Sequence, residues 1–382
     1  MSNIIYRHFQ PGDEKQLAEL FTRAFQTNKV GITRTPKVLY WRYMQSPNFE
    51  PNMIQIAEDR DKRLIVGAVY VHFIEEIPFN DKVYKVGEIN DVSCHPDYVK
   101  KGIATNLMNL AIDYMKKKEC DISMLNAGQN SIARIKMYLK LGYEDLEKKY
   151  NFVQCPNFAN LFINMPIFAT LFFPFYNIFY FVRILKRIKF RFNKLFKSFS
   201  YEIVYNKSHF RYMEAANRIL SKNYTGFPPY TKEKLIWARI KIPSKRFIPT
   251  YILIKKENKI VGGAVLTHQN LYSFKYGFKI RFGIVHEIFL DKEVFNNDKN
   301  QISSGFQYLI DKVMKAAARR YLGSIIIQSS SKNNDLNCAL RKLFFLKMLD
   351  ESMMIKYINK KDKIPKSLKP LFLPTYITIG YP

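Results

Sequence analysis

The chain has 382 residues, a hydrophobic fraction of 47% and a formal net charge of +29. This length suits two domains of ordinary size, and the positive charge favours an anionic partner surface. Because no nucleic-acid-binding motif accompanies the charge, we expect no specific nucleic-acid partner. The four cysteines form no Cys-x-x-Cys pair, the six histidines show no metal-ligand spacing, and the N-terminus lacks the pattern of a signal peptide. We therefore predict a cytoplasmic protein without a metal centre.

The first predicted elements are a strand from Ile4 to Phe9 and an amphipathic helix that begins at Pro11-Gly12-Asp13-Glu14. The segment 26–52 then contains the aromatic run Tyr40-Trp41-Arg42-Tyr43. These rings could wall an acceptor pocket, or they could simply pack in the core. We favour core packing for Trp41.

Residues 88–117 hold an extended apolar run, a turn with one glycine and an amphipathic helix. Gly102 follows two lysines and leads directly into the helix, which ends in three lysines at 116–118. The helix is indicated by apolar residues at three-and-four spacing, namely Ile103, Leu107, Leu110, Ala111, Tyr114 and Met115. Glycine lets the backbone approach a ligand, and the first amides of a helix have no partner within it. The pattern therefore predicts an anion-binding turn that suits a phosphate.

A second predicted helix opens twelve residues after those lysines, with the order Asn130-x-x-Ala133-x-x-x-x-Tyr138-x-x-x-Gly142-Tyr143. With this run, residues 3 to 150 resemble the GCN5-related N-acetyltransferase family. The family signature is a Gln/Arg-x-x-Gly-x-Gly/Ala turn followed by a helix. Here Val99 stands in place of the Gln or Arg, and Ala104 stands in place of the commoner second glycine.

The resemblance implies where acetyl-CoA, or another acyl-CoA, would bind. The strand before the turn would contact the pantetheine arm, the turn amides would hold the pyrophosphate, and Asn130 would bind the amide arm. The positions implied in the strand and the turn are Val92, Ser93, Cys94, Lys100, Lys101, Gly102, Ile103, Ala104 and Thr105.

Two residues are candidates for the chemistry. Glu88 lies fourteen residues before Gly102, where some members of the family carry a carboxylate, and it could take the proton of an attacking amine. Tyr138 would lie by the thioester sulfur and could protonate the leaving thiolate. Glu88 could instead be a solvated strand residue, and Tyr138 could be ordinary helix packing. Asp91 has the opposite strand parity to Glu88, so it lies on the other face unless a bulge intervenes. Some related tandem enzymes use a C-terminal carboxylate, which makes the apolar segment 371–382 a further alternative.

The middle of the chain has a different composition. No charged residue occurs from 161 to 182, and the cations Arg183, Lys186, Arg187, Lys189, Arg191, Lys194 and Lys197 follow. Pro166 and Pro174 disfavour a simple spanning helix. We predict that residues 161–197 lie at an anionic membrane surface, which would place the protein peripherally at the inner face of the membrane. The alternative is a pair of linker helices buried between two units, with the cations reaching outward.

The two tryptophans mark an internal repeat. Pro47 and Pro243 each lie six residues after Trp41 and Trp237, and Gly67 and Gly263 each lie 26 residues after them. The second copy has no glycine in the stretch 295–300 that replaces the phosphate turn, and Phe344 replaces the tyrosine. It therefore looks degenerate. It would wall the substrate cleft, pair its sheet with that of the first copy, or bind independently.

Together these patterns predict an α/β fold of two tandem acetyltransferase-like units, each with a mixed central sheet flanked by helices. The first unit spans 1–155 and binds acyl-CoA, a helical linker spans 156–200, and the degenerate unit spans 201–382. The predicted activity is acyl transfer, most simply of acetyl, to an amine of an unidentified acceptor. Two alternatives remain: a noncatalytic membrane-surface or nucleic-acid-binding protein on this scaffold, and an aminoacyl transferase of the Fem type. The glycine turn at Gly102 argues against the Fem type.

Overall fold

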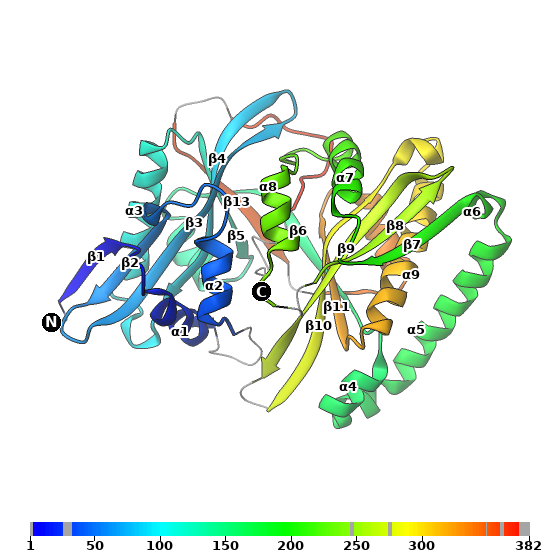
Figure 1. Cartoon of the computed structure of the whole chain (residues 1–382), viewed down its shortest axis with the longest axis horizontal. Helices are drawn as coiled ribbons and strands as arrows, with labels where there is room; N and C mark the ends of the chain where they lie inside the picture. Colours follow the sequence, from blue (N-terminus) through cyan, green and yellow to red (C-terminus); the bar gives the residue numbers. More distant parts are fainter. Residues whose placement is uncertain are drawn as a thin grey trace.

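The structure is a computed structural model that describes residues 3–25, 33–244, 248–273, 277–348, 350–359 and 363–373. Within these ranges, one continuous mixed sheet of 13 strands runs through both halves of the chain. Figure 1 shows the N-terminal half on the left and the C-terminal half on the right. The C-terminal carboxylate, which was an alternative candidate for the chemistry, lies outside the described residues.

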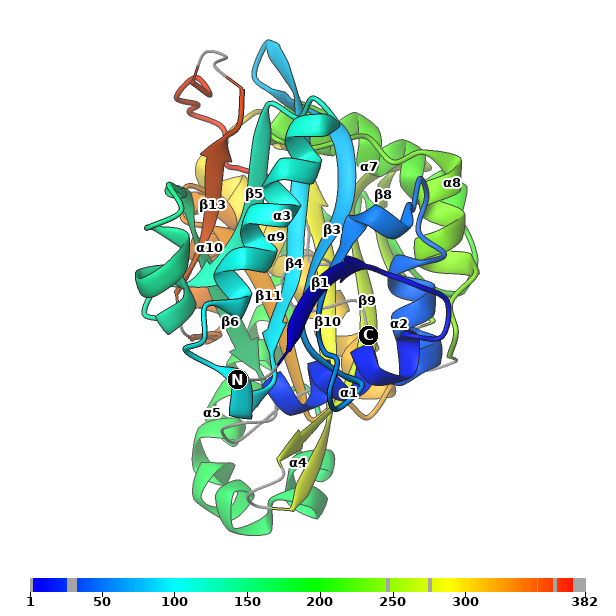
Figure 2. The same ribbon diagram turned by 90° about the vertical axis from the view of Figure 1, so that its left-hand side faces the viewer.

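The N-terminal half begins with a strand, two helices and an antiparallel meander of three strands. Helix α3 covers one sheet face through Leu107, while α1 and α2 cover the other through Leu17 and Leu39 (Figure 2). Its elements are β1 Ile4–His8, α1 Glu14–Phe25, α2 Pro36–Tyr43, η1 Pro51–Met53, β2 Ile54–Asp59, β3 Leu64–Phe79, β4 Lys82–Cys94, η2 Pro96–Tyr98, α3 Ile103–Lys117, β5 Ile122–Gly128, η3 Arg134–Tyr138 and β6 Glu144–Gln154.

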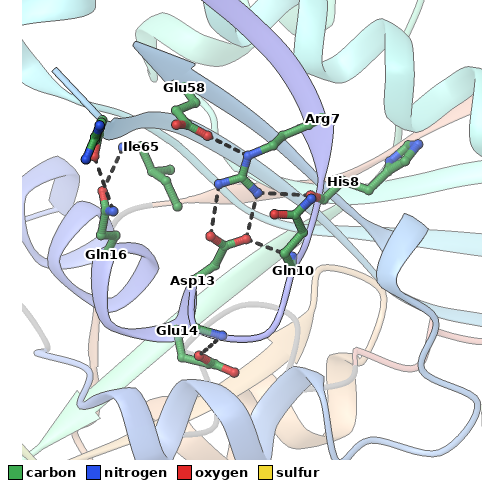
Figure 3. A network of polar contacts seen from close by, with 10 residues as sticks. Arg7, His8, Gln10, Asp13, Glu14, Gln16, Glu58 and Ile65 are labelled. Atoms are coloured by element: carbon green, nitrogen blue, oxygen red, sulfur yellow. Dashed lines mark hydrogen bonds and ion pairs between the residues drawn. The ribbon is translucent and has the colours of Figure 1, made fainter. Parts of the chain in front are cut away.

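A cluster of charged residues ties β1 to α1 and β2 (Figure 3). The Arg7 guanidinium donates to both carboxylate oxygens of Asp13 at 2.8 and 2.9 Å and to Glu58 at 2.6 Å. Asp13 also accepts the backbone N–H of Gln10 at 2.8 Å. These contacts raise the pKa of Arg7, with the Asp13 hydrogen bond as the largest cause. The corner where β1 turns into α1 is thereby fixed by Arg7 and Asp13, which lie 6 positions apart in the sequence, and is tied to β2 by Glu58.

The C-terminal half repeats the order of the first half after three linker helices. The linker consists of α4 Phe158–Asn164, α5 Pro166–Phe192 and α6 Lys194–Lys197. The repeat consists of β7 Phe199–Tyr205, α7 His209–Asn223, α8 Lys232–Leu235, η4 Ile236–Ile240, β8 Thr250–Lys256, β9 Lys259–Ser273, β10 Phe278–Leu290, η6 Lys292–Phe295, α9 Lys299–Arg319, β11 Ser324–Ser330, α10 Asn334–Lys342, β12 Leu346–Lys347 and β13 Glu351–Tyr357.

The two halves exchange their last strands. The sheet order is β1-β2-β3-β4-β5-β13-β6-β11-β10-β9-β8-β7. Strand β13 from the end of the chain therefore pairs with β5, and β6 from the first half pairs with β11. Each half completes the sheet of the other, so the segments 1–155 and 201–382 do not form two separate sheets.

The linker helices lie on the outer side of the second half, so the alternative of linker helices buried between the two units is wrong (Figure 1). Arg187 of α5 pairs with Asp311 of α9 at 2.7 Å, and Phe179 stacks on Phe344 at 5.4 Å. Phe162 and Phe173 remain about half exposed. In the part of the chain that the structure describes, no helix is both long and apolar enough to cross a bilayer.

Candidate active site

The site is built around a gap between β4 and β5. Their parallel pairing runs from Val86 and Ile122 to Ile89 and Leu125, while the strands themselves continue to Cys94 and Gly128. Beyond Ile89 and Leu125 the two strands diverge. The edge of β4 that faces this gap presents backbone groups to any ligand that enters it, because backbone N–H and C=O groups need partners.

A bulge in β4 changes the face on which its side chains lie within the gap. Asn90 pairs with Tyr70, whereas Ser93 pairs with Ala68, so β4 has one more residue than β3 across this stretch. The extra residue coincides with Asp91, whose φ of +47° is unusual for a non-glycine residue. A bulge changes the face on which the following side chains lie. The simple alternation expected from the sequence therefore ends at this point.

The predicted strand contacts line this part of β4. Val92 and Cys94 are half-buried against the α3 side of the sheet. Ser93 is buried and donates its hydroxyl to the carbonyl of Ala68 at 3.4 Å. Burial raises the pKa of the Cys94 thiol, so this thiol remains protonated near neutral pH and is a poor nucleophile.

The predicted phosphate turn forms the N-terminus of α3. Gly102 is the residue before the helix, with a φ of +78°, and no side chain caps the first turn. Lys100, Lys101 and Thr105 are exposed, and Ala104 is half-buried. Ile103 is buried and anchors the start of the helix. The turn therefore offers uncapped helix amides next to two lysines, which is an arrangement that favours an anion.

The segment around Asn130 departs from the prediction. Asn130 lies in a turn before the helix, which is short: residues 132–133 are α-helical and the π-helix Arg134–Tyr138 follows. Asn130 is exposed in the turn, and Tyr138 is 7% exposed, with its ring 6.0 Å from that of Tyr143. Burial raises the pKa of the Tyr138 phenol, so the hydroxyl keeps its proton at neutral pH. Wider π-helical turns often occur at functional sites.

Glu88 is fully buried, and neither of its carboxylate oxygens has a hydrogen-bond partner among the described residues. Burial, followed by the negative charge of Glu75, raises its pKa well above the ordinary value of 4.5. The interpretation of Glu88 as a solvated strand residue is therefore wrong. An unpartnered buried carboxyl group costs stability, and such groups are concentrated at functional sites.

Asp91, in contrast, is held by cations. Arg34 and Tyr43 donate to its carboxylate, and Arg42 lies 3.6 Å from it. Arg34 is buried, and this burial together with the nearby Arg42 lowers its pKa to about 9. Because its charge is already neutralised, Asp91 is less suited than Glu88 to accept a proton.

The two candidate catalytic residues lie on opposite faces of the sheet. Ile89 and Tyr138 belong to the apolar cluster under α3. Glu88 alternates with Ile89 and therefore points to the other face, where Glu75, Lys234 and Arg42 affect its pKa. A ligand that entered from the α3 side could thus meet an acceptor that approached from the Glu88 side.

A polar cluster next to this gap was not predicted from the sequence. Asn126 of β5 donates to Glu351 of β13 at 2.6 Å, and Asn151 of β6 donates to it at 3.0 Å. The buried Lys149 also pairs with Glu351. These residues lie up to 225 positions apart and meet only because β13 inserts between β5 and β6.

The second half keeps the bulge but has no counterpart of the Glu88 carboxyl group. Strand β10 has one extra residue against β9 between Val285 and Ile288. At the repeat offset of 196, Asp91 corresponds to Glu287, which is buried and paired with Arg239 at 2.9 Å. Glu88 corresponds to Ile284, which cannot accept a proton. The degenerate character predicted for this half therefore extends to its equivalent of Glu88.

The first half of the chain is similar to known acetyltransferases. Residues 5–145 match the model of the acetyltransferase (GNAT) domain. An uncharacterized N-acetyltransferase of Methanocaldococcus jannaschii is 38% identical over 63 residues, which are 16% of this chain. The match spans only 28% of that relative.

Solved structures share the fold over nearly the whole chain. Saccharomyces cerevisiae N-myristoyltransferase with bound myristoyl-CoA aligns with a TM-score of 0.68 at 12% identity, covering 93% of this chain and 79% of that one. A GCN5-related N-acetyltransferase from Anabaena variabilis aligns with a TM-score of 0.56 at 12% identity, covering 94% and 73%. The predicted α/β fold of two tandem acetyltransferase-like units is confirmed, and residues 5–145 match a GNAT domain.

Proposed function

We propose that this chain, whose first half matches a GNAT domain, is an acyl-CoA-dependent N-acyltransferase with one active site in that half. The observation that carries the proposal is the conjunction of the β4–β5 gap, the uncapped turn at Gly102 and the unpartnered carboxyl group of Glu88. The donor is acetyl-CoA or another acyl-CoA, and the acceptor is an amine.

In the proposed reaction, the acceptor nitrogen attacks the thioester carbonyl directly. Glu88 takes a proton from the acceptor's ammonium group, directly or through water, and the uncharged amine that results is the nucleophile. The C–S bond breaks as the amide bond forms, and Tyr138 donates its proton to the departing thiolate. The second proton that the nitrogen loses returns to the Tyr138 phenolate through water. The turn from Lys100 to Thr105 holds the pyrophosphate, the β4 edge at Val92, Ser93 and Cys94 holds the pantetheine arm, and Asn130 contacts its amides.

Calorimetric titration with CoA, acetyl-CoA and myristoyl-CoA tests the donor, and thiol release in the presence of short and long amines tests the reaction. Myristoyl-CoA is included because the yeast structures that share the fold contain it. We expect binding of at least one acyl-CoA and amine-dependent release of CoA. Binding without release with any amine would favour the noncatalytic alternative, and the absence of binding would refute the proposal.

A further inference from the structure

An apolar cavity of about 560 Å³ lies between α5 and the sheet of the second half. Its walls include Phe172 and Phe179 of α5, Ile280 and Phe282 of β10, Ile326 of β11 and Phe344. This volume falls within the range of about 300–1,000 Å³ that is typical of small-molecule sites. The cavity lies outside the proposed active site, so the proposed reaction does not explain it.

The polar end of the cavity lies on the same sheet face as Glu88. Glu351 and Asn151 line the cavity, and Asn126 connects Glu351 to β5. Glu88 is in register with Met124 of β5 and Ile355 of β13, so Glu351 lies two strands across and four residues along the sheet from it, at roughly 16 Å. An acceptor with its amine at Glu88 would therefore need a spacer of this length before its apolar chain enters the cavity.

The chemistry of the polar end limits the occupant. Gln154 lines the cavity through other atoms, because its side-chain oxygen is buried and has no hydrogen-bond partner among the described residues. Glu351 is held in its ionised form, because Lys149 and the asparagines outweigh the opposing effect of burial and lower its pKa overall. A negative charge beside Glu351 would be repelled, whereas an amine, amide or hydroxyl group could donate to the partly exposed Glu351 carboxylate.

We propose that this cavity binds one long apolar chain of the acceptor, an alkyl or acyl chain without a carboxylate at its polar end. The statement that this apolar chain belongs to the acceptor rests on the proposed function. The statement that the cavity binds an apolar chain does not. Each buried methylene should strengthen binding about fourfold until the cavity is full.

The test compares dodecylamine, butylamine and dodecanoate, all below their micelle concentrations, by calorimetric titration of the whole protein. We expect dodecylamine to bind at least tenfold more tightly than either of the other two. Val153→Phe places a ring in the cavity and should abolish this preference. Val204→Phe is the matched control, because Val204 is also half-buried but lies on edge strand β7, where it packs on a different cluster.

Turnover separates the two proposals. If dodecylamine binds and Val153→Phe removes the binding, the cavity assignment stands even when no amine is acylated. If dodecylamine binds no more tightly than butylamine, or if its binding does not respond to Val153→Phe, the cavity assignment is overturned, while amine-dependent release of CoA still supports the proposed function.

A separate observation concerns the outer face of α5. Large apolar side chains recur there at three-and-four spacing and are between 46% and 80% exposed: Ile167, Leu171, Phe175, Ile178, Phe181, Leu185, Ile188 and Phe192. We call these residues the α5 stripe. The stripe runs along the whole helix, and its regular period makes it one face rather than scattered exposure.

The charges near the stripe divide into two groups. Arg183 is buried, Lys186 donates to Gln307 at 2.6 Å, and Arg187 pairs with Asp311. Lys189, Arg191, Lys194 and Lys197 are exposed instead. No acidic residue occurs between 149 and 201 to compensate them. An apolar helical face with cations beside it matches the surface of an anionic bilayer.

We infer that the α5 stripe docks in the plane of an anionic lipid surface, with the four exposed cations among the headgroups. Sedimentation with vesicles of equimolar phosphatidylglycerol and phosphatidylcholine tests this inference. Salt should weaken the binding by screening the cations, but a salt-resistant part from the buried stripe should remain.

Two variants and one control show which residues produce the salt-sensitive and the salt-resistant parts of vesicle binding. Changing Lys189, Arg191, Lys194 and Lys197 to Gln should weaken binding roughly 100-fold or more, since each such residue contributes about fivefold. Changing Lys207, Lys232, Lys241 and Lys259 to Gln removes the same charge elsewhere and should have little effect. Phe175→Gln with Ile178→Gln should remove the salt-resistant part. Equal losses of vesicle binding in the two charge-removing variants, or failure of the unchanged protein to sediment with vesicles at low salt, would overturn the inference.

Discussion

Trp41 and Trp237 hydrogen-bond to each other's backbone across the centre of the molecule. The Trp41 indole N–H donates to the carbonyl of Trp237 at 3.1 Å, and the Trp237 indole N–H donates to the carbonyl of Trp41 at 2.8 Å. Their rings stack at 5.5 Å with an interplanar angle of 25°. Both are buried, which confirms core packing for Trp41. The repeated residues of the two halves thus form one reciprocal contact.

Replacing either tryptophan should destabilise the whole protein. Trp41→Phe removes an indole donor and leaves the buried carbonyl of Trp237 without it, at a cost of about 1–3 kcal/mol. Because the contact is reciprocal, the double variant with Trp237→Phe should cost less than the sum of the single variants. Urea unfolding followed by circular dichroism measures all three. Strict additivity would show that the two tryptophans act independently.

Gly102→Asp should abolish acyl-CoA binding, because it places a negative charge where the pyrophosphate is proposed to lie. A Cβ at Gly102 meets nothing within 4 Å, so the only local cost is the positive φ. Gly102→Asn is the matched control, since asparagine tolerates this conformation and has the same shape without the charge. Calorimetric titration should show retained binding for Asn and lost binding for Asp. Equal affinity in the two variants would contradict the placement of the phosphate.

Glu88→Gln should lower turnover by roughly 10²-fold or more, because it removes the proposed base. The pKa of Glu88 is raised, so the ionised form that can accept a proton appears only as the pH rises through that higher value. The acidic limb of kcat/KM should therefore lie well above pH 4.5 and disappear in the variant. Glu147→Gln changes another buried carboxyl group with a raised pKa and should leave the limb in place. If Glu88→Gln retains both the rate and the limb, another group is the base.

The same variant should stabilise the protein near neutral pH. A carboxyl group whose pKa is higher in the folded than in the unfolded state stabilises the fold fully below the unfolded pKa, and this contribution is lost as the pH rises through the folded pKa. Thermal unfolding of the unchanged protein should thus show a fall in Tm above pH 4.5 that Glu88→Gln reduces. If Tm falls with pH in the same way in both proteins, the Glu88 carboxyl group is hydrated or hydrogen-bonded in solution.

Tyr138→Phe should lower kcat roughly 10²-fold with little change in KM, since the hydroxyl is proposed to act only on the leaving thiolate. The ring and its packing on Tyr143 are retained in the variant. Tyr143→Phe is the control, because it removes a hydroxyl that lies 2.6 Å from the Ser123 hydroxyl and has no proposed part in the chemistry. Steady-state kinetics should separate the two variants, and equal kcat values would assign Tyr138 to packing.

Local patterns in the sequence were sufficient for the first half of the fold. The turn at Gly102 and helix α3 follow from a glycine, a charge pattern and a helical period that lie within twenty residues. The repeat offset between Trp41 and Trp237 likewise predicted two similar units. Patterns of this kind are readable because glycine conformation, helix period and strand alternation are properties of neighbouring residues.

Only the tertiary structure decided how the halves combine. The insertion of β13 between β5 and β6, and the meeting of Asn126 with Glu351, depend on pairing between strands more than 200 residues apart. The bulge at Asp91 and the burial of Glu88 also depend on neighbouring strands, since a carboxylate in a strand has the same sequence signal on either face. Likewise, the hydrophobicity of residues 161–197 could not reveal which side of α5 packs on the second half. Sequence carries the local preference of each segment, while the partner that a segment buries, and the charge that burial perturbs, are set by the packed fold.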